Sequence, residues 1–322
     1  MKHLTAASVL ALCVGSAALA QDFTLNINTA LATSDPLYAG LEALRDNVAE
    51  ASGGQLAIVL YPNSQLGPDE DVLEQARAGA PVAVVVDGGR LAVYQEEMGI
   101  LGAPFLASGY EGIRNVVTSD VFQGWVDEMA DTSGLQVLSF NWWQGERHLL
   151  TNKAITGPED LAGIRMRTPG APVWMGTIEA MGATPTPMPW ADVYSALSSN
   201  VIDGAEAQFP AIVGANLQEV IDHVTKTGHI NLITGLVTSA QWFDTLPEDL
   251  QAILLEESLK AGDIASYGTQ DSLDAIEQQL VDAGVTVDEI DTAIFRDATA
   301  KVYDDLGYGD LRDQVQAIAA GN

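Results

Sequence analysis

Two arginines separated by one residue are the first candidates for chemistry in this sequence. From Ile164 to Pro169, apolar and basic side chains alternate as in a half-buried strand. Arg165 and Arg167 therefore share one strand face. A guanidinium group holds a carboxylate through two parallel hydrogen bonds and stays charged at any relevant pH. The pair can thus serve an anion-binding site or salt bridges within the protein.

The chain around this pair is strongly acidic. Its 322 residues carry 44 Asp and Glu against 14 Lys and Arg, a formal net charge of −30. Nucleic acids and anionic lipids bind basic surfaces, so we expect neither as a partner. Most of the carboxylates are expected to be solvated surface groups.

The first 20 residues have the pattern of a secretory signal peptide. Lys2 precedes an apolar run at 4–14, and Ala18 and Ala20 form a cleavage signal before Gln21. The single cysteine, Cys13, lies in this segment, so the mature chain is expected to have no disulfide. We therefore predict a periplasmic protein, and the remaining length suffices for two domains.

Strands and helices alternate along the mature chain, which predicts an α/β fold with a parallel sheet. The expected strands are 23–27, 56–60, 82–86, 135–140, 164–169, 183–185, 201–202 and 229–238. The expected helices are 37–52, 68–78, 113–129, 172–181, 190–199 and a region near the end of the chain. The segment 247–283 is predicted as one long bent helix or two helices, because it holds two glycines.

The motifs of several enzyme classes are absent from the sequence. There is no Gly-Lys pair for a phosphate-binding loop, and no G-x-G-x-x-G, G-x-S-x-G or H-E-x-x-H. Four histidines, one of them in the signal segment, cannot form a histidine-rich metal site. We expect no cofactor and no metal, while an acid/base enzyme built on two carboxylates stays open.

Several motifs, in their order and spacing, resemble the solute-binding proteins of tripartite ATP-independent periplasmic (TRAP) transporters of the dicarboxylate-binding type. The motifs lie at 61–67, 103–106, 161–167, 188–194, 201–206 and 246–249. The resemblance implies two α/β domains of a type II-like periplasmic binding protein, with a ligand cleft between them and a long helix spanning both. It also implies that a bound small organic acid, a carboxylate or a sulfonate, is delivered to the TRAP membrane permease.

We divide the chain on this basis. After the signal peptide, 1–20, the first domain is expected to comprise 21–143 plus 233–272. The second domain is expected to comprise 144–232 plus 273–322. The chain would cross between the domains more than once, as a hinged protein requires, and we expect a monomer.

The resemblance places Arg167 on the carboxylate of the ligand and Arg147 beside it as a second ligand-facing arginine. Arg165 occupies a less constant family position, so a surface ion pair is expected for it. Trp190 matches an aromatic residue that packs on the ligand. Of the neighbours Trp142 and Trp143, one is expected to line the cleft.

The other candidate contacts come from both halves of the chain. Asp87 matches an acidic family position and, with Arg90, follows the strand 82–86, where α/β sheets bind ligands. For Arg90 the alternative is a salt bridge that locks the domains together. Asp69 is either a ligand contact or a first-turn acid of a helix. Further candidates are Glu206, Gln208 and Phe209.

One position departs from the family pattern. Many acid-binding members carry Asn or Trp after the residue matching Glu206, and this chain has Ala207. The change implies a bulkier or differently substituted acid, with Gln208 or Phe209 compensating. In some members a cation binds in this region, which Glu206 leaves open. His148 and His229 are expected to be structural.

The sequence thus predicts a periplasmic binding protein for a small organic acid and not an enzyme. The alternatives are a sensory protein that presents its ligand to a receptor, or a carboxylate-handling enzyme on the same scaffold. The pattern does not choose among C4-dicarboxylates, sugar acids, 2-oxo acids, aromatic acids and sulfonates.

Overall fold

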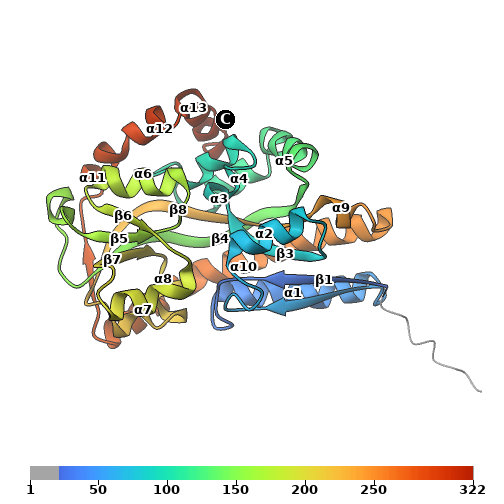
Figure 1. Cartoon of the computed structure of the whole chain (residues 1–322), viewed down its shortest axis with the longest axis horizontal. Coiled ribbons are helices and arrows are strands. Elements are labelled where there is room, and N and C mark those ends of the chain that lie inside the picture. The colour runs from blue at the N-terminus through green and yellow to red at the C-terminus, as the bar shows by residue number, and fades with distance from the viewer. Residues whose placement is uncertain (1–21, 322) are drawn as a thin grey trace, which may run out of the picture.

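The computed structural model describes residues 22–321, so the predicted signal peptide lies outside the described residues. The described chain forms one mixed sheet of nine strands with helices packed around it (Figure 1). The strand order is β2-β1-β3-β8-β4-β7-β5-β6, and β9 pairs with β8. The predicted α/β class is confirmed, although the sheet is mixed and not purely parallel.

Three parallel strands form the part that we call the first lobe. They are β1 (Phe23–Asn28), β2 (Leu56–Tyr61) and β3 (Val82–Asp87). Between them come α1 (Pro36–Ala51) and α2 (Asp69–Arg77), and β3 leads into α3 (Gly88–Leu91) and η1 (Glu96–Gly102). Every residue of β3 is buried, as its uninterrupted apolar run predicts.

Three further parallel strands form the second lobe. They are β5 (Arg165–Thr168), β6 (Thr184–Pro187) and β7 (Gly204–Ala207). The helices between and after them are α6 (Pro172–Met181), α7 (Val193–Ser198) and α8 (Phe209–Gly214), with short turns η2 (Pro158–Leu161), η3 (Trp190–Asp192) and η4 (Leu217–Glu219).

Two long antiparallel strands belong to both lobes. β4 (Leu135–Thr151) and β8 (His223–Ser239) have 17 residues each and pair along most of their length. One end of β8 pairs with β3, and the opposite end of β4 pairs with β7. Both strands are longer than predicted, because each continues from one lobe into the other. They form the crossing connection that the resemblance implies.

The stretch after Pro247 forms one helix and not two. α10 (Glu248–Asp282) has 35 residues and contacts α1 of the first lobe, β4, and α8 of the second lobe (Figure 1). It leads into β9 (Thr286–Glu289). α1 lies so close to α10 that a Cβ atom on Gly40 would be 2.7 Å from the carbonyl oxygen of Ala261.

Several predicted boundaries are wrong. The helix expected at 113–129 is two helices, α4 (Gly109–Val117) and α5 (Asp120–Ser133), because Ser119 caps α5 by accepting from the N–H of Phe122. The helix expected at 190–199 is divided into η3 and α7. The residues 201–202 form no strand: Asn200 has a left-handed φ of 56° and turns the chain, so that β7 begins at Gly204.

The last helices contact both lobes. α11 (Ala293–Thr299) packs against α6, and α13 (Gly309–Ala319) packs against α4, with α12 (Lys301–Asp305) between them. α9 (Ala240–Phe243) follows β8. The division of the chain into the two predicted domains therefore stays a prediction, since 273–322 contacts elements of both lobes.

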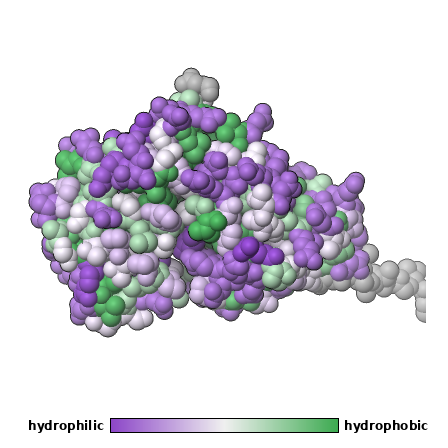
Figure 2. Space-filling view, turned by 45° about the horizontal axis from the view of Figure 1, so that its top comes forward, coloured by the Kyte–Doolittle hydropathy of each residue, from purple (hydrophilic) through white to green (hydrophobic). Residues whose placement is uncertain are grey.

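The surface is largely polar. Hydrophilic residues dominate the face visible in Figure 2, in keeping with the excess of carboxylates. None of the helices between residues 22 and 321 combines the length and the apolar character needed to cross a membrane.

The close contact between α1 and α10 can be tested with two glycine variants. We expect Gly40→Ala to lower the free energy of unfolding by about 1–3 kcal/mol, because the added methyl group pushes α1 away from the backbone of α10. Gly268→Ala, on α10 with open space around it, should change stability little or raise it by up to about 1 kcal/mol. Urea unfolding measures both, and equal effects would contradict the packing.

Candidate functional site

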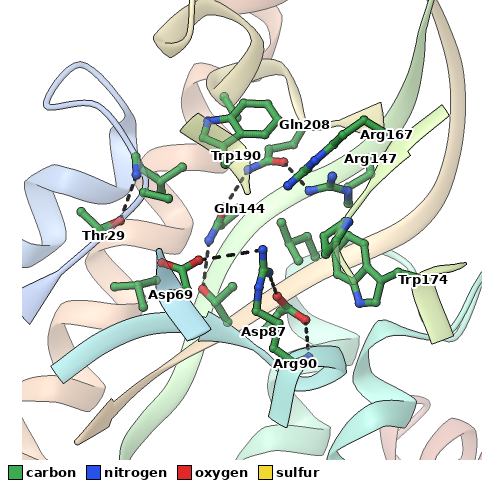
Figure 3. A pocket seen from close by; sticks show the side chains of 17 residues that line it. Thr29, Asp69, Asp87, Arg90, Gln144, Arg147, Arg167, Trp174, Trp190 and Gln208 are labelled. Carbon is green, nitrogen blue, oxygen red and sulfur yellow. Dashed lines mark hydrogen bonds and ion pairs between the residues drawn. The ribbon is translucent and has the colours of Figure 1, made fainter. Parts of the chain in front are cut away.

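A cavity lies between the two lobes, where β3 and β5 end and β4 and β8 cross (Figure 3). It encloses about 510 Å³, including its opening to solvent. Its polar and aromatic lining residues are Thr29, Asp69, Asp87, Arg90, Gln144, Arg147, Arg167, Trp174, Trp190, Gln208 and Thr234. Apolar groups of Ala30, Leu31, Val85, Pro169, Ala211 and Leu232 complete it. Both lobes and both crossing strands therefore contribute to one cavity.

Arg167 is a buried cation without an ionic partner. Only 1% of its surface is exposed. Its Nε and Nη2 donate to the carbonyl oxygen of Met188, at 3.1 and 2.9 Å, and its guanidinium carbon lies 5.2 Å from the centre of the Trp190 ring. Among residues 22–321, no carboxylate lies within ion-pair distance of it. Burial lowers its pKa to about 9, and the neighbouring Arg147 also lowers it, so Arg167 is charged at neutral pH.

Arg147 differs from Arg167 because its charge is paired. Its Nε forms a buried ion pair with Glu206, its Nη2 donates to the backbone carbonyl of Glu206, and its Nη1 donates to Oε1 of Gln208 at 3.2 Å. One face of its guanidinium group lies 4.6 Å from the centre of the Trp174 ring. Arg147 thus lines the cavity, but its charge is already compensated by Glu206, which lies outside the lining.

Glu206 lies behind the cavity and not in its lining. It is fully buried, and its second oxygen accepts from the hydroxyl of Thr168 at 3.0 Å. Burial raises the pKa of Glu206, but Arg147 and His229 outweigh it and bring that pKa down to about 2. Since both carboxylate oxygens are engaged, Glu206 has little to offer a bound cation.

The two histidines of this region have structural contacts. Burial, and then the neighbouring His229, lower the pKa of His148 to about 3, so the ring of His148 is neutral. Its Nδ1 accepts from the N–H of Gly228 at 3.1 Å. His229 contacts Thr227 through Nδ1, at 2.8 Å, and is fully buried.

The opposite wall of the cavity carries carboxylates (Figure 3). Asp87 ends β3 and caps α3 by accepting from the N–H of Arg90 at 3.0 Å. The Arg90 side chain forms ion pairs with Asp87 and, at 2.8 Å, with Glu70, and lies 3.9 Å from Asp69. Three carboxylates therefore surround one guanidinium group, so this wall keeps a negative charge.

Asp69 is both a first-turn residue of a helix and part of the cavity lining. It is in the first turn of α2, and it lines the cavity with 8% of its surface exposed. Burial raises the pKa of its carboxyl group to about 6, although the charge of Arg90 lowers it. Its buried Oδ1 has no hydrogen-bond partner within the described chain. This oxygen can accept a hydrogen bond from a ligand.

A chain of amide groups connects the two walls. Gln208 accepts from Arg147 and donates to Oε1 of Gln144 at 2.6 Å, and Gln144 donates to the hydroxyl of Thr234 at 3.2 Å. These groups occupy β4, β8 and the end of β7, where Ala207 itself is fully buried. Gln208, and not Phe209, therefore supplies polar groups to the cavity next to Ala207.

The cavity collects six of the nine predicted contact residues and leaves out three. Arg167, Arg147, Trp190, Asp87, Arg90 and Gln208 line it. Glu206, Phe209 and Trp143 lie outside its lining, so their positions do not support a ligand contact. The indole N–H of Trp143 donates to Asn231 at 2.6 Å and that of Trp142 to Ser139 at 2.8 Å. Both rings are buried and neither is in the cavity lining, so the expectation that one lines the cleft has no support from their positions.

Sequence reasoning missed Trp174, Gln144, Thr234 and Thr29. Gln144 had a weak signal, since it precedes Arg147 on the crossing strand. Trp174 had none, because its place in the first turn of α6 reads as helix core.

Arg165 is where expected: it pairs with Asp203 at 2.8 Å on the surface of the second lobe.

Within the described part of the chain, no group of three or more His, Cys, Asp or Glu side chains is arranged to hold a metal ion.

Comparison with known proteins gives one family. The profile described as "Bacterial extracellular solute-binding protein, family 7" matches residues 27–309. A TRAP periplasmic solute-binding protein of Escherichia fergusonii, in an apo open structure, is 42% identical, with a TM-score of 0.80 over 92% of this chain and 99% of the other.

Two ligand-bound structures agree more closely in shape. TRAP periplasmic solute-binding proteins of Ochrobacterium anthropi, with bound L-fuconate, and Actinobacillus succinogenes, with bound L-galactonate, are 31% and 28% identical. Both have a TM-score of 0.89, over 92% and 93% of this chain and 99% and 100% of theirs. Their TM-scores exceed the 0.80 of the apo open structure, although their sequence identities are lower.

The Arg147–Glu206 ion pair is buried and the Arg165–Asp203 ion pair is exposed, so breaking them should cost different amounts of stability. We expect Glu206→Gln to lower the free energy of unfolding by about 3–5 kcal/mol at pH 7, because it leaves the buried charge of Arg147 without compensation. Asp203→Asn breaks an exposed pair in the same lobe and should leave stability nearly unchanged. Urea denaturation compares the variants, and a Glu206→Gln protein as stable as Asp203→Asn would show that Arg147 does not depend on Glu206 for charge compensation.

Proposed function

The chain belongs to family 7 of the bacterial extracellular solute-binding proteins, and on this premise we propose that it binds a sugar acid in the periplasm and delivers it to a TRAP permease. A sugar acid has one carboxylate at one end and hydroxyl groups along the rest of its chain. The name "dicarboxylate" in the family resemblance describes a narrower set of ligands than the relatives bind, since two of them hold the sugar acids L-fuconate and L-galactonate.

The unpaired charge of Arg167 is the observation that carries this proposal. A buried cation without a counter-charge is costly, and a carboxylate with good hydrogen-bond geometry compensates for it. Arg167 already has Met188 on one edge and Trp190 beside its face, which fix the direction of its guanidinium group. A ligand carboxylate would complete the pair with two parallel hydrogen bonds.

The acidic wall supports hydroxyl groups at the other end of the ligand. Asp69 and Asp87 accept hydrogen bonds when ionised, and a hydroxyl group donates them. A second carboxylate on the ligand would face these groups and be repelled. The free Oδ1 of Asp69 is an acceptor without a donor. The site therefore favours a hydroxylated monocarboxylate over a C4-dicarboxylate.

The geometry also bears on the two alternative functions, an enzyme and a sensory protein. The cavity lining contains no histidine, cysteine or lysine, and Asp87 is already tied to Arg90. The relatives are named as solute-binding proteins, and no feature of the cavity favours an enzymatic or sensory role. Because both lobes line the cavity, the ligand stabilises their closed arrangement, which is the form a permease can recognise.

The test of the proposal combines a ligand panel with an arginine variant. We expect L-galactonate, L-fuconate and D-glucuronate to raise the melting temperature, and succinate to have little effect. Arg167→Ala should weaken binding about 30- to 4000-fold by calorimetry, as expected for loss of one partner of a buried charge pair. The melting temperature of the free protein should change by only a few degrees.

Arg165→Ala is the matched control, since it removes the neighbouring arginine on the same strand but at the surface. It should bind the sugar acids as the wild type does. Near-normal affinity of Arg167→Ala, or stabilisation by succinate but by none of the sugar acids, would contradict the proposal.

The buried Asp69 predicts a pH dependence of binding. Ligand hydroxyls donate to its ionised carboxylate, and because its pKa is about 6, a proton occupies that group in the free protein below this pH. Binding must then displace the proton, so affinity for L-galactonate should fall by up to about tenfold per pH unit below pH 6. Asp69→Asn should flatten this dependence, whereas Asp71→Asn, exposed on the same helix, should keep it. Titration calorimetry from pH 5 to 8 measures it.

A further inference from the structure

Trp174 links the ligand cavity to a contact between the two lobes. It stands in the first turn of α6 in the second lobe, with 1% of its surface exposed. One face of the indole ring covers Arg147 at the cavity wall, 4.6 Å from the guanidinium carbon to the ring centre. Figure 3 shows the ring beside Arg147 at the edge of the site.

The nitrogen edge of the same ring reaches the first lobe. A Cβ atom on Gly89 would be 2.1 Å from Nε1 of Trp174, and a Cβ atom on Gly102 would be 2.6 Å from it. Gly89 is in α3 and Gly102 ends η1, and both elements follow β3. We call this pair of glycines the glycine notch. Neither glycine is among the residues that line the cavity.

The backbone conformation does not explain these two glycines. Both have φ values outside the left-handed region that favours glycine. Glycine in a helical segment costs up to about 1 kcal/mol relative to alanine, so its use there needs another reason. The space occupied by the indole ring supplies one. The contact is steric, because Nε1 of Trp174 has no acceptor within the described chain.

We propose that Trp174 is an interdomain wedge: its seating in the glycine notch, which lies outside the cavity lining, stabilises the closed arrangement of the lobes and so strengthens ligand binding. The ring can seat only when α6 approaches α3 and η1. One face of the ring packs on the guanidinium group of Arg147 while its nitrogen edge fills the notch, so the notch and the cavity share one rigid side chain. Trp174 is in this sense a positioning residue for binding. The inference rests on the proposed function for its ligand, but its steric basis does not.

Gly102→Ala tests the wedge from a residue outside the cavity lining, because the closest atoms to the added methyl group belong to Trp174 and Val173 on α6. We expect calorimetry to show about tenfold to hundredfold weaker binding of L-galactonate, from overpacking in the closed state alone. Gly124→Ala in α5, where the methyl group meets nothing, is the matched control and should bind normally.

A double-mutant cycle identifies the ring as the cause. In a Trp174→Ala background, Gly102→Ala should cause little further loss of affinity, because the clash has been removed. Equal losses in both backgrounds, or no loss in the wild-type background, would overturn the proposal. If Gly102→Ala does not fold, Trp174→Phe replaces it: the smaller ring still covers Arg147 but leaves the notch unfilled, and wild-type affinity of that variant would overturn the wedge.

A ligand-independent measurement separates this inference from the proposed function. The chain has six tryptophans, so its nitrogen-15 spectrum has six indole signals, and Trp174→Phe assigns one of them. Gly102→Ala should shift that signal and leave the signal of Trp242, which belongs to a different hydrophobic cluster, in place. If the wild type binds no sugar acid, the proposed function fails while this shift still tests the notch. An unmoved Trp174 signal would overturn the wedge.

Discussion

The buried positive charge of Arg167 is the constraint on which the rest of this site depends. Its neighbour Arg147 has Glu206 as a partner, and exposed Arg165 has Asp203, but Arg167 has a carbonyl group and an aromatic ring. A protein with so many carboxylates could easily have supplied one. Leaving this charge unpaired costs stability, which an anionic ligand returns when it binds. The fold thus stores part of the binding free energy in one side chain.

The crossing strands connect the site of that charge to both lobes. β4 carries Arg147 and Gln144, and β8 carries Thr234, so the amide chain between the two walls follows the strands that join the lobes. Arg167 belongs to the second lobe and Arg147 to the crossing strand β4, whereas Asp69 and Asp87 belong to the first lobe, where the one arginine, Arg90, is paired with carboxylates. A ligand with one carboxylate and many hydroxyls matches both walls at once, and this match couples ligand binding to the approach of the lobes.

Sequence patterns predicted the parts of this site that have a local cause. The alternation around Arg167 and the apolar run before Asp87 each place a side chain at a strand end. What they could not predict depends on distant partners. Glu206 has the family's spacing, but its carboxylate forms an ion pair with Arg147. The space for the Trp174 ring is left by glycines of the other lobe. The lengths of β4 and β8 were likewise set by pairing across both lobes, which no local pattern records.

The orientation of the bound ligand tests the role of Arg167 most directly. A crystal structure of the protein with L-galactonate measures it directly. We predict that both carboxylate oxygens accept hydrogen bonds from the guanidinium group of Arg167, and that hydroxyl groups at the other end donate to Asp69. A carboxylate bound away from Arg167, or a ligand turned so that its carboxylate lies beside Asp69 and Asp87, would contradict it.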